Sequence, residues 1–231
     1  MSHLHLPDGI LPIWLWLLGY VILSLLLLRI SLTVKKSLLE KKIPLIGMLS
    51  ALMIISMSIE LPIGYHINLA ALSGILLGPA FSLLSMLTVS IFLSLLGHGG
   101  ITTIAVNTLI LATEASLAWV LFKGFRRINI KQNIKTFIAV FMALVVSTVI
   151  SVTVFYVGTN EFDVLHTHSE EHVEAEANEH EIDFRKFLLL ISGIGVIGWT
   201  IEACISSFIV GYILKVKPEL LSVEEESNET A

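Results

Sequence analysis

The chain has 231 residues, of which 55% are hydrophobic and only 14% are charged. A soluble domain carries about 25% charged residues, and long uncharged apolar runs recur along this chain, so we expect an all-α integral membrane protein. No stretch of linker composition divides it, so we expect a single membrane domain over residues 1–231. The basic residues form only short loops, which argues against a nucleic-acid partner. The single cysteine, Cys204, excludes an internal disulfide and is expected to be a small buried side chain.

Residues 1–9 read Met-Ser-His-Leu-His-Leu-Pro-Asp-Gly and precede an apolar run over about residues 10–30. A secretory signal would begin with a basic region, and this segment contains no Lys or Arg, so we expect a retained transmembrane helix. The Leu6-Pro7-Asp8-Gly9 sequence favours a turn. We therefore predict that residues 1–9 form a strap that folds back toward the helix bundle and caps a metal site.

Further apolar runs predict six more helical segments, at about residues 43–59, 69–77, 80–96, 102–122, 137–157 and 187–214. Gly78-Pro79 interrupts an apolar run and predicts a helix boundary there. The segment at 69–77 is too short to span a bilayer, so it is expected to pack against protein. Residues 158–183 predict an external loop rich in His and Glu, and residues 217–231 a cytoplasmic tail.

The positive charges predict the orientation, because Lys and Arg in short loops mark the cytoplasmic side. Grouping alternate connections places all 14 Lys and Arg residues except Arg185 and Lys186 on one side. About seven transmembrane helices are expected, with the N-terminus outside and the C-terminus inside. All eight histidines then fall on the outer side: His3, His5, His66, His98, His166, His168, His172 and His180. Neutral imidazole is the commonest side-chain ligand for divalent transition metals, so the outer face is predicted to bind metal.

Four of these histidines are candidates for one site. His5 lies in the strap, His66 follows the second helix, and His98 lies in a glycine-rich turn. Each alone is more simply explained as an interfacial residue with one solvated end, but together with His3 they favour coordination. If Met1 is removed, His3 offers its terminal amine, its amide nitrogen and its ring; if Met1 stays, a similar chelate includes one more amide. Such nitrogen sets suit Ni(II) or Cu(II).

Three acidic residues, Glu60, Glu114 and Glu202, stand in or beside apolar helices, where a charge is costly. They are expected to face the protein interior or an interface. Glu60 is a candidate for orienting a ligand ring, as His98 also is. Glu114 and Glu202 are expected to bond polar groups of neighbouring helices, and none of the three is expected to be a metal ligand.

The sequence His168-Ser169-Glu170-Glu171-His172 matches the H-x-x-E-H pattern of some zinc peptidases. In a segment so rich in both residues the match arises easily, so a membrane-embedded zinc hydrolase is the alternative. A loose metal-collecting loop is favoured over this and over a merely solvated acidic loop. The glycines of residues 193–198 are expected to serve helix packing. The chain has no P-loop and no nucleophile elbow, so it is not expected to be an enzyme or to use ATP itself.

Several motifs together resemble the CbiM/NikM family, the substrate-capture membrane subunits of energy-coupling-factor transporters for cobalt or nickel. They are His5-Leu6-Pro7-Asp8-Gly9-Ile10-Leu11-Pro12, Gly64-Tyr65-His66, Leu77-Gly78-Pro79, and Gly97-His98-Gly99-Gly100-Ile101-Thr102-Thr103 with Asn107. The resemblance implies a seven-helix subunit of the cell membrane that captures Co(II) or Ni(II) outside for ATP-driven uptake, which can feed cobalamin synthesis. It implies the metal as transported substrate, with no permanent cofactor. The implied partners are a transmembrane coupling subunit, cytoplasmic ATPase subunits and a small accessory membrane protein.

The resemblance also implies a ligand set. In the family the chain starts Met-His, and the metal is held by the terminal amine, by the amide and ring of that His, and by a His after the second helix. By motif these roles pass to His5 and His66. Here Met1-Ser2-His3 precede the family's start, which leaves three alternatives: His3 takes the amine-linked role, His5 binds by its ring alone, or the true start lies elsewhere. A capture subunit for an organic vitamin is a further alternative, and it would need an aromatic pocket.

Overall fold

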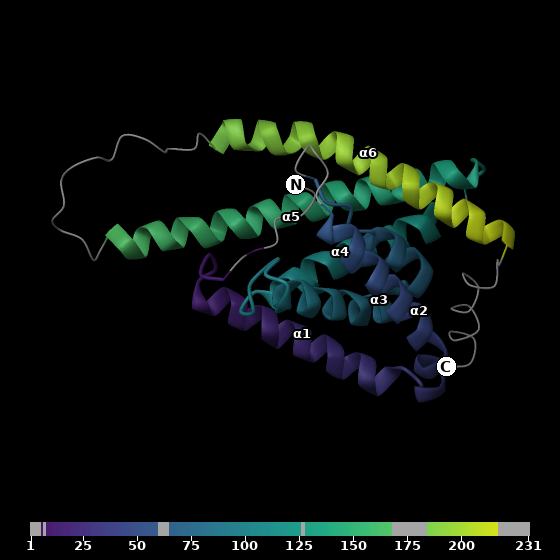
Figure 1. Cartoon of the computed structure of the whole chain (residues 1–231), viewed down its shortest axis with the longest axis horizontal. Helices are drawn as coiled ribbons and strands as arrows, with labels where there is room; N and C mark the ends of the chain where they lie inside the picture. Colours follow the sequence, from purple (N-terminus) through teal and green to yellow (C-terminus); the bar gives the residue numbers. More distant parts are fainter. Residues whose placement is uncertain (1–5, 7, 60–64, 126–127, 168–183, 217–231) are drawn as a thin grey trace.

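The computed structural model describes residues 6, 8–59, 65–125, 128–167 and 184–216, and within these ranges it contains six α-helices and no strand (Figure 1). The helices are α1 (Ile13–Thr33), α2 (Lys36–Ser58), α3 (Ala70–Leu95), α4 (Ile104–Gly124), α5 (Gln132–Thr167) and α6 (Phe184–Val216). α3 packs against α2 and α4, α4 also contacts α1 and α5, and α5 pairs with α6. In Figure 1, α5 and α6 run side by side along one flank of the molecule, and α1 lies on the opposite flank.

Among the described residues, five helices are long and apolar enough to cross a membrane: α1, α3, α4, Gln132–Gly158 of α5 and Gly195–Val216 of α6. Their outward faces carry large apolar side chains, such as Leu32 at 77% exposure and Phe208 at 74%. So much exposed apolar surface is stable only when lipid covers it. The predicted all-α, multi-pass membrane protein is therefore confirmed. α2, which contains Lys41, Lys42 and Pro44, is not among the five.

The two short segments that the sequence predicted on either side of Gly78-Pro79 form one kinked helix, α3. Gly78 has φ 77° and ψ 172°, a conformation that only glycine adopts readily, and Pro79 cannot donate a backbone hydrogen bond. Every residue from Ala70 to Gly78 is buried. The expectation that this first half packs against protein is confirmed, and the predicted boundary is a kink within the helix.

Two helices, α2 and α5, extend furthest beyond their predicted bounds. α2 begins at Lys36, inside the stretch expected to be a basic loop, where Lys36 and Glu40 lie 4.0 Å apart one turn along the helix. α5 continues to Thr167, so the first part of the expected loop at 158–183 is helical, and residues 168–183 lie outside the described structure. Hydropathy marks the membrane-embedded part of a helix, whereas the polar turns beyond it leave no apolar signal.

The expectation that Cys204 is buried is wrong. Its side chain is exposed on α6. A thiol behaves as a small apolar group, so lipid accommodates it as readily as a protein core does.

Candidate metal-capture site

The backbone of Leu6 is bound to the loop before α4 and to the first turns of that helix. Its N–H donates to Asn107 Oδ1 at 3.3 Å, and its carbonyl accepts from Gly100 N at 3.2 Å, from Asn107 Nδ2 at 3.4 Å and from the hydroxyl of Thr103. Its side chain is fully buried in an apolar cluster. The buried members of that cluster are Leu6, Leu11, Val106 and Ile110. The chain directly after His5 is thus fixed at the start of α4.

Asp8 forms a second attachment of the strap. Its carboxylate accepts from Thr102 N at 2.8 Å, from Thr102 Oγ1 at 2.6 Å and from Ile101 N at 3.0 Å. The hydrogen bond from the Thr102 hydroxyl, followed by those from the two backbone amides, lowers the pKa of Asp8 below its usual 3.8. A Cβ on Gly100 would lie 2.2 Å from Asp8 Oδ1, so glycine is required for this approach. The turn that the sequence predicted at Leu6 to Gly9 therefore lies against the bundle.

The segment that carries His66 connects α2 to α3 and is held from α6. Tyr65 is fully buried, and its hydroxyl donates to Glu202 Oε2 at 3.2 Å. The Tyr65 ring lies where a Cβ on Gly198 would be, so this glycine makes room for it. Asn68 N donates to the same Glu202 oxygen at 3.3 Å. His66 lies between these two anchored residues and is half-buried.

The first turn of α3 is capped by buried side chains. The first N–H groups of a helix have no partner within it. Here Leu69 N donates to Glu202 Oε1 at 2.9 Å, Ala70 N to Asn68 Oδ1 at 2.6 Å, and Ala71 N to Glu114 Oε1 at 3.2 Å. Asn68 Nδ2 also donates to Glu114 Oε2 at 3.4 Å. Glu114 and Glu202 thus face the interior and bond a neighbouring element, as the sequence predicted.

Both anchored segments meet one face of α4. Thr103 and Asn107 hold Leu6, and Glu114 holds Asn68 and the start of α3. Positions 103, 107 and 114 are spaced by four and seven residues, which places them on the same side of a helix. Seven residues correspond to about 10 Å along the helix axis. The chain after His5 and the chain after His66 are therefore attached to the same side of α4, about two turns apart.

The predicted ligands fall partly outside the described residues. His3, His5, Glu60 and the motif at 168–172 lie there, and within the part that is described no group of three or more His, Cys, Asp or Glu side chains forms a metal site. His98 is exposed in the turn after α3, where its backbone N–H donates to Leu93 O at 2.8 Å. That turn reaches the strap through Gly100.

Sequence reasoning from the residues did not assign roles to Asn107 and Thr103. Their signal is two polar residues one turn apart at the start of an otherwise apolar helix, which indicates a bound partner in the protein interior. It also missed the left-handed backbone of Leu69, with φ 58°. A leucine gives no local signal for that conformation, because the contacts that impose it come from α4 and α6.

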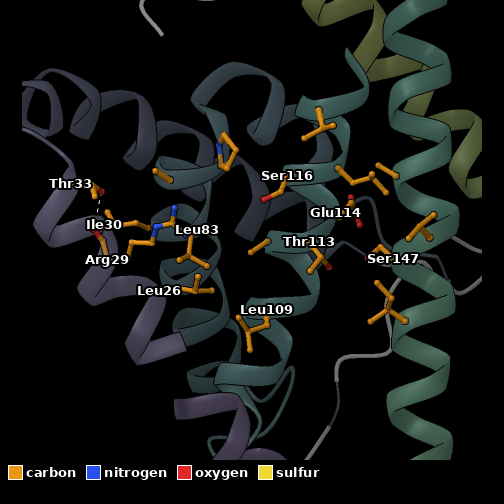
Figure 2. Close-up of a pocket in the computed structure, with 18 residues that line it drawn as sticks. Leu26, Arg29, Ile30, Thr33, Leu83, Leu109, Thr113, Glu114, Ser116 and Ser147 are labelled. Atoms are coloured by element: carbon orange, nitrogen blue, oxygen red, sulfur yellow. Dashed lines mark hydrogen bonds between the residues drawn. The ribbon is translucent and has the colours of Figure 1, made fainter. Parts of the chain in front are cut away.

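A cavity of about 750 Å³ lies between α1, α3, α4 and α5 (Figure 2). Its lining is mostly aliphatic, with polar groups at Arg29, Thr33, Thr113, Glu114, Ser116 and Ser147. Figure 2 shows Arg29 and Thr33 on the α1 side and Ser147 on the α5 side, with Glu114 between them on α4. None of the described residues that line it is aromatic.

Comparison with known proteins identifies the family. The CbiM family model, described as "Cobalt uptake substrate-specific transmembrane region", matches residues 5–220. "Cobalt transport protein CbiM" of Clostridium cellulovorans is 33% identical over 141 residues, which cover 57% of this chain and 54% of that protein. The chain therefore spans about half the length of this curated relative.

Two solved structures share the fold. "Crystal Structure of an transition metal transporter" has a TM-score of 0.69 at 19% identity and covers 92% of this chain and 93% of its own. "Crystal Structure of an Truncated Transition metal Transporter" has a TM-score of 0.65 at 18% identity and covers 91% of this chain and 98% of its own. The similarity thus extends well beyond the motifs of the first half of the chain. Because the family model spans nearly all of its length, the chain belongs to the CbiM family of cobalt-uptake substrate-specific transmembrane regions.

Proposed function

We propose that this protein is the substrate-specific membrane subunit of an ATP-driven, energy-coupling-factor type uptake system for Co(II) or Ni(II). It captures the ion on the outer face, and partner subunits drive its transfer inward. The observation that carries this proposal is the attachment of Leu6 and Asn68 to one face of α4. This attachment supports a common metal site for the segments that carry His5 and His66.

The proposed ligands are His5 and His66, with His3 as the third. His5 is next to Leu6, and His66 is two residues before Asn68; the backbone N–H groups of Leu6 and Asn68 are both held by buried side chains. Imidazole and amine nitrogens suit both Co(II) and Ni(II). His98 and Glu60 are proposed to orient ligand rings rather than to bind the ion directly.

The strap attachments have an energetic purpose in this proposal. A free N-terminal segment loses conformational entropy when it closes over an ion. The hydrogen bonds at Leu6 and Asp8 order the chain up to the ligand before the ion arrives. Preorganisation of this kind raises affinity without any additional contact to the metal.

The partners are proposed from the family relationship and from the sequence. No glycine in the chain is followed by lysine, so the phosphate-binding sequence G-x-x-x-x-G-K-[ST] does not occur. ATP hydrolysis is therefore assigned to cytoplasmic ATPase subunits. A transmembrane coupling subunit, and a small accessory membrane protein, would link them to this chain.

A capture subunit for an organic vitamin receives no support from the cavity between α1 and α5. A site for a planar ring would offer aromatic side chains for stacking. The described lining of this cavity is mostly aliphatic, with hydroxyl side chains and the charged residues Arg29 and Glu114. Metal capture therefore remains the proposed function.

The metal content of the purified chain with its native N-terminus tests the proposal. Wild-type protein loaded with Co(II) or Ni(II) and then desalted is expected to retain about one ion per chain. His5→Ala and His66→Ala are expected to lose it, and His3→Ala shows whether the third nitrogen ligand comes from that residue. His168→Ala and His172→Ala serve as matched controls and are expected to keep the ion. Retention of wild-type metal content by both His5→Ala and His66→Ala would contradict the proposal.

A further inference from the structure

We propose that Glu114 and Glu202 are positioning residues for metal capture, because they fix residues 65–71 and thereby set the direction of the His66 imidazole. The inference rests on the proposed function, since it assigns a purpose to two buried carboxylates that do not bind the ion. Both side chains are almost completely buried, at 1% and 0% exposure.

The segment that they hold lies inside the helix bundle. Glu114 is ten residues from the start of α4, which corresponds to about 15 Å along that helix. Because Glu114 bonds Ala71 N and Asn68, the beginning of α3 lies at that depth. Non-helical backbone at membrane depth is tolerated only where the protein satisfies its polar groups. Residues 65–69 are such backbone, and the two carboxylates provide acceptors for it.

The connections to this segment exceed what an ordinary helix cap needs. One side-chain oxygen at the N-cap usually satisfies one or two N–H groups. Here Glu202 accepts from Tyr65, Asn68 and Leu69, and Glu114 accepts from Asn68 and Ala71. The carboxylates reach the segment from two different helices, so the segment is fixed on both sides.

The backbone conformation of Leu69 points the same way. Its φ of 58° is left-handed, a conformation that a Cβ-bearing leucine avoids unless the surroundings impose it. Glu202 Oε1 accepts the Leu69 N–H at 2.9 Å. This bend allows the chain to pass from His66 directly into α3. Backbone strain maintained by buried polar contacts beside a proposed ligand is typical of a site that requires one defined geometry.

The placement of His66 follows from its neighbours. Tyr65, which precedes His66, bonds the Glu202 carboxylate, and its ring packs against Gly198. Asn68, which follows His66 by two residues, bonds both carboxylates. With both neighbours anchored, the backbone of His66 is held in place, and the position and direction of its Cα–Cβ bond are fixed with it. Metal coordination depends strongly on ligand direction, so loosening either neighbour is expected to weaken binding.

The test compares Co(II) binding by the full-length chain carrying Glu202→Gln, Glu114→Gln or Tyr65→Phe with binding by wild type. Gln keeps the shape of the side chain, but it replaces one acceptor with an NH₂ donor that faces other donors. Tyr65→Phe keeps the ring at Gly198 and removes the hydroxyl, so it decides the matter if the Gln variants do not fold. The control is Ser50→Ala, which removes the 2.8 Å hydroxyl contact to Ser85 between α2 and α3, in the half of α3 beyond the kink.

Dissociation constants, the visible absorption spectrum of bound Co(II) and hydrogen exchange of residues 65–71 are measured together. We expect at least a tenfold rise in the dissociation constant, a changed spectrum and faster exchange in the Gln variants, and a smaller shift in the same direction for Tyr65→Phe. Ser50→Ala is expected to retain wild-type affinity and spectrum.

Wild-type affinity and spectrum in the folded Glu202→Gln and Glu114→Gln variants would overturn the inference. The proposed function would still stand in that case if His66→Ala abolishes binding. If wild-type protein binds neither Co(II) nor Ni(II), the proposed function fails and this inference fails with it.

Discussion

At the scale of single residues, the few polar side chains of the apolar helices do the positioning. Asn107 and Thr103 bind the backbone of the strap, and Glu114 and Glu202 bind the start of α3. A carboxylate that faces lipid costs free energy, so the sequence predicted that Glu114 and Glu202 lie in the protein interior. Their partners were not predictable, because residues 43 to 137 positions away supply the hydrogen bonds. Pairing across such distances depends on how the helices pack.

The pKa of Asp8 gives a prediction at this scale. A carboxyl whose pKa is lower in the folded state than its usual 3.8 stabilises the fold above that value, and the contribution is lost as pH falls through the lower, folded-state pKa. The Asp8 attachment is therefore expected to remain intact from about pH 8 to about pH 5, the range in which free histidine, with a pKa of about 6.5, becomes protonated. Any loss of Co(II) binding in this range is therefore not expected to come from protonation of Asp8.

The measurement is the pH dependence of Co(II) affinity for wild type and Asp8→Asn. Asn cannot accept all three hydrogen bonds from Ile101 and Thr102, so the variant is expected to bind several-fold more weakly at every pH. The midpoint of the pH curve is expected to be the same in both proteins. A midpoint that moves with the substitution would show that the carboxyl titrates in this range.

At the scale of elements, α3 and its contact with α4 determine the geometry of the site. The Gly78-Pro79 break was readable from the sequence because glycine followed by proline interrupts a helix. The sequence could not predict that the two halves remain one kinked helix, because this depends on how α3 packs against α2 and α4. The close approach of Gly74 to Ala115 is a further contact of this kind, and it lies one residue from Glu114.

Substitution of Gly74 by alanine is expected to separate α3 from α4. The added Cβ would lie 2.0 Å from the carbonyl oxygen of Ala115, and backbone cannot move aside as a flexible side chain can. We expect a loss of about 1–3 kcal/mol in stability, typical of overpacking, measured as a lower melting temperature in detergent. Weaker Co(II) binding is expected as well, because the shift displaces Ala71 from Glu114.

The matched control is Gly47→Ala on α2, where a Cβ meets nothing within 4 Å. Alanine favours a helix over glycine by about 1 kcal/mol, so this variant is expected to melt at the same temperature as wild type or higher. Equal melting temperatures for Gly74→Ala and wild type would contradict the close packing of α3 on α4.

At the scale of the whole molecule, composition alone predicted an all-α membrane protein, because uncharged apolar runs of spanning length have few other uses. The positions of the apolar runs along the chain also predicted approximately where each apolar helix lies. The polar extensions of α2 and α5 were missed, since they lie beyond the apolar signal. From the sequence, the strap and the His66 segment could be predicted only to lie at the same outer end of the bundle. Their attachment to the same side of α4 could not be predicted, because it depends on side-chain contacts between elements.

The predicted orientation can be tested with single cysteines in a Cys204→Ser background. Leu96→Cys, in the exposed turn after α3, is expected to react with a membrane-impermeant thiol reagent added outside intact cells. Lys131→Cys, between α4 and α5, is expected to react only after the membrane is opened, because its basic loop marks the cytoplasmic side. The reverse pattern of labelling would place the histidine-rich face inside the cell and contradict capture from outside.

The central claim is that the strap and the segment before α3 bring imidazoles to one ion. X-ray absorption at the cobalt edge of the loaded wild-type protein, with its native N-terminus, measures this most directly. We predict a nitrogen-dominated first shell with the scattering pattern of at least two imidazoles, and no ordered cobalt shell in His66→Ala, which is expected to lose the ion. An oxygen-only shell in the wild-type protein, or the wild-type spectrum in desalted His66→Ala, would contradict this claim.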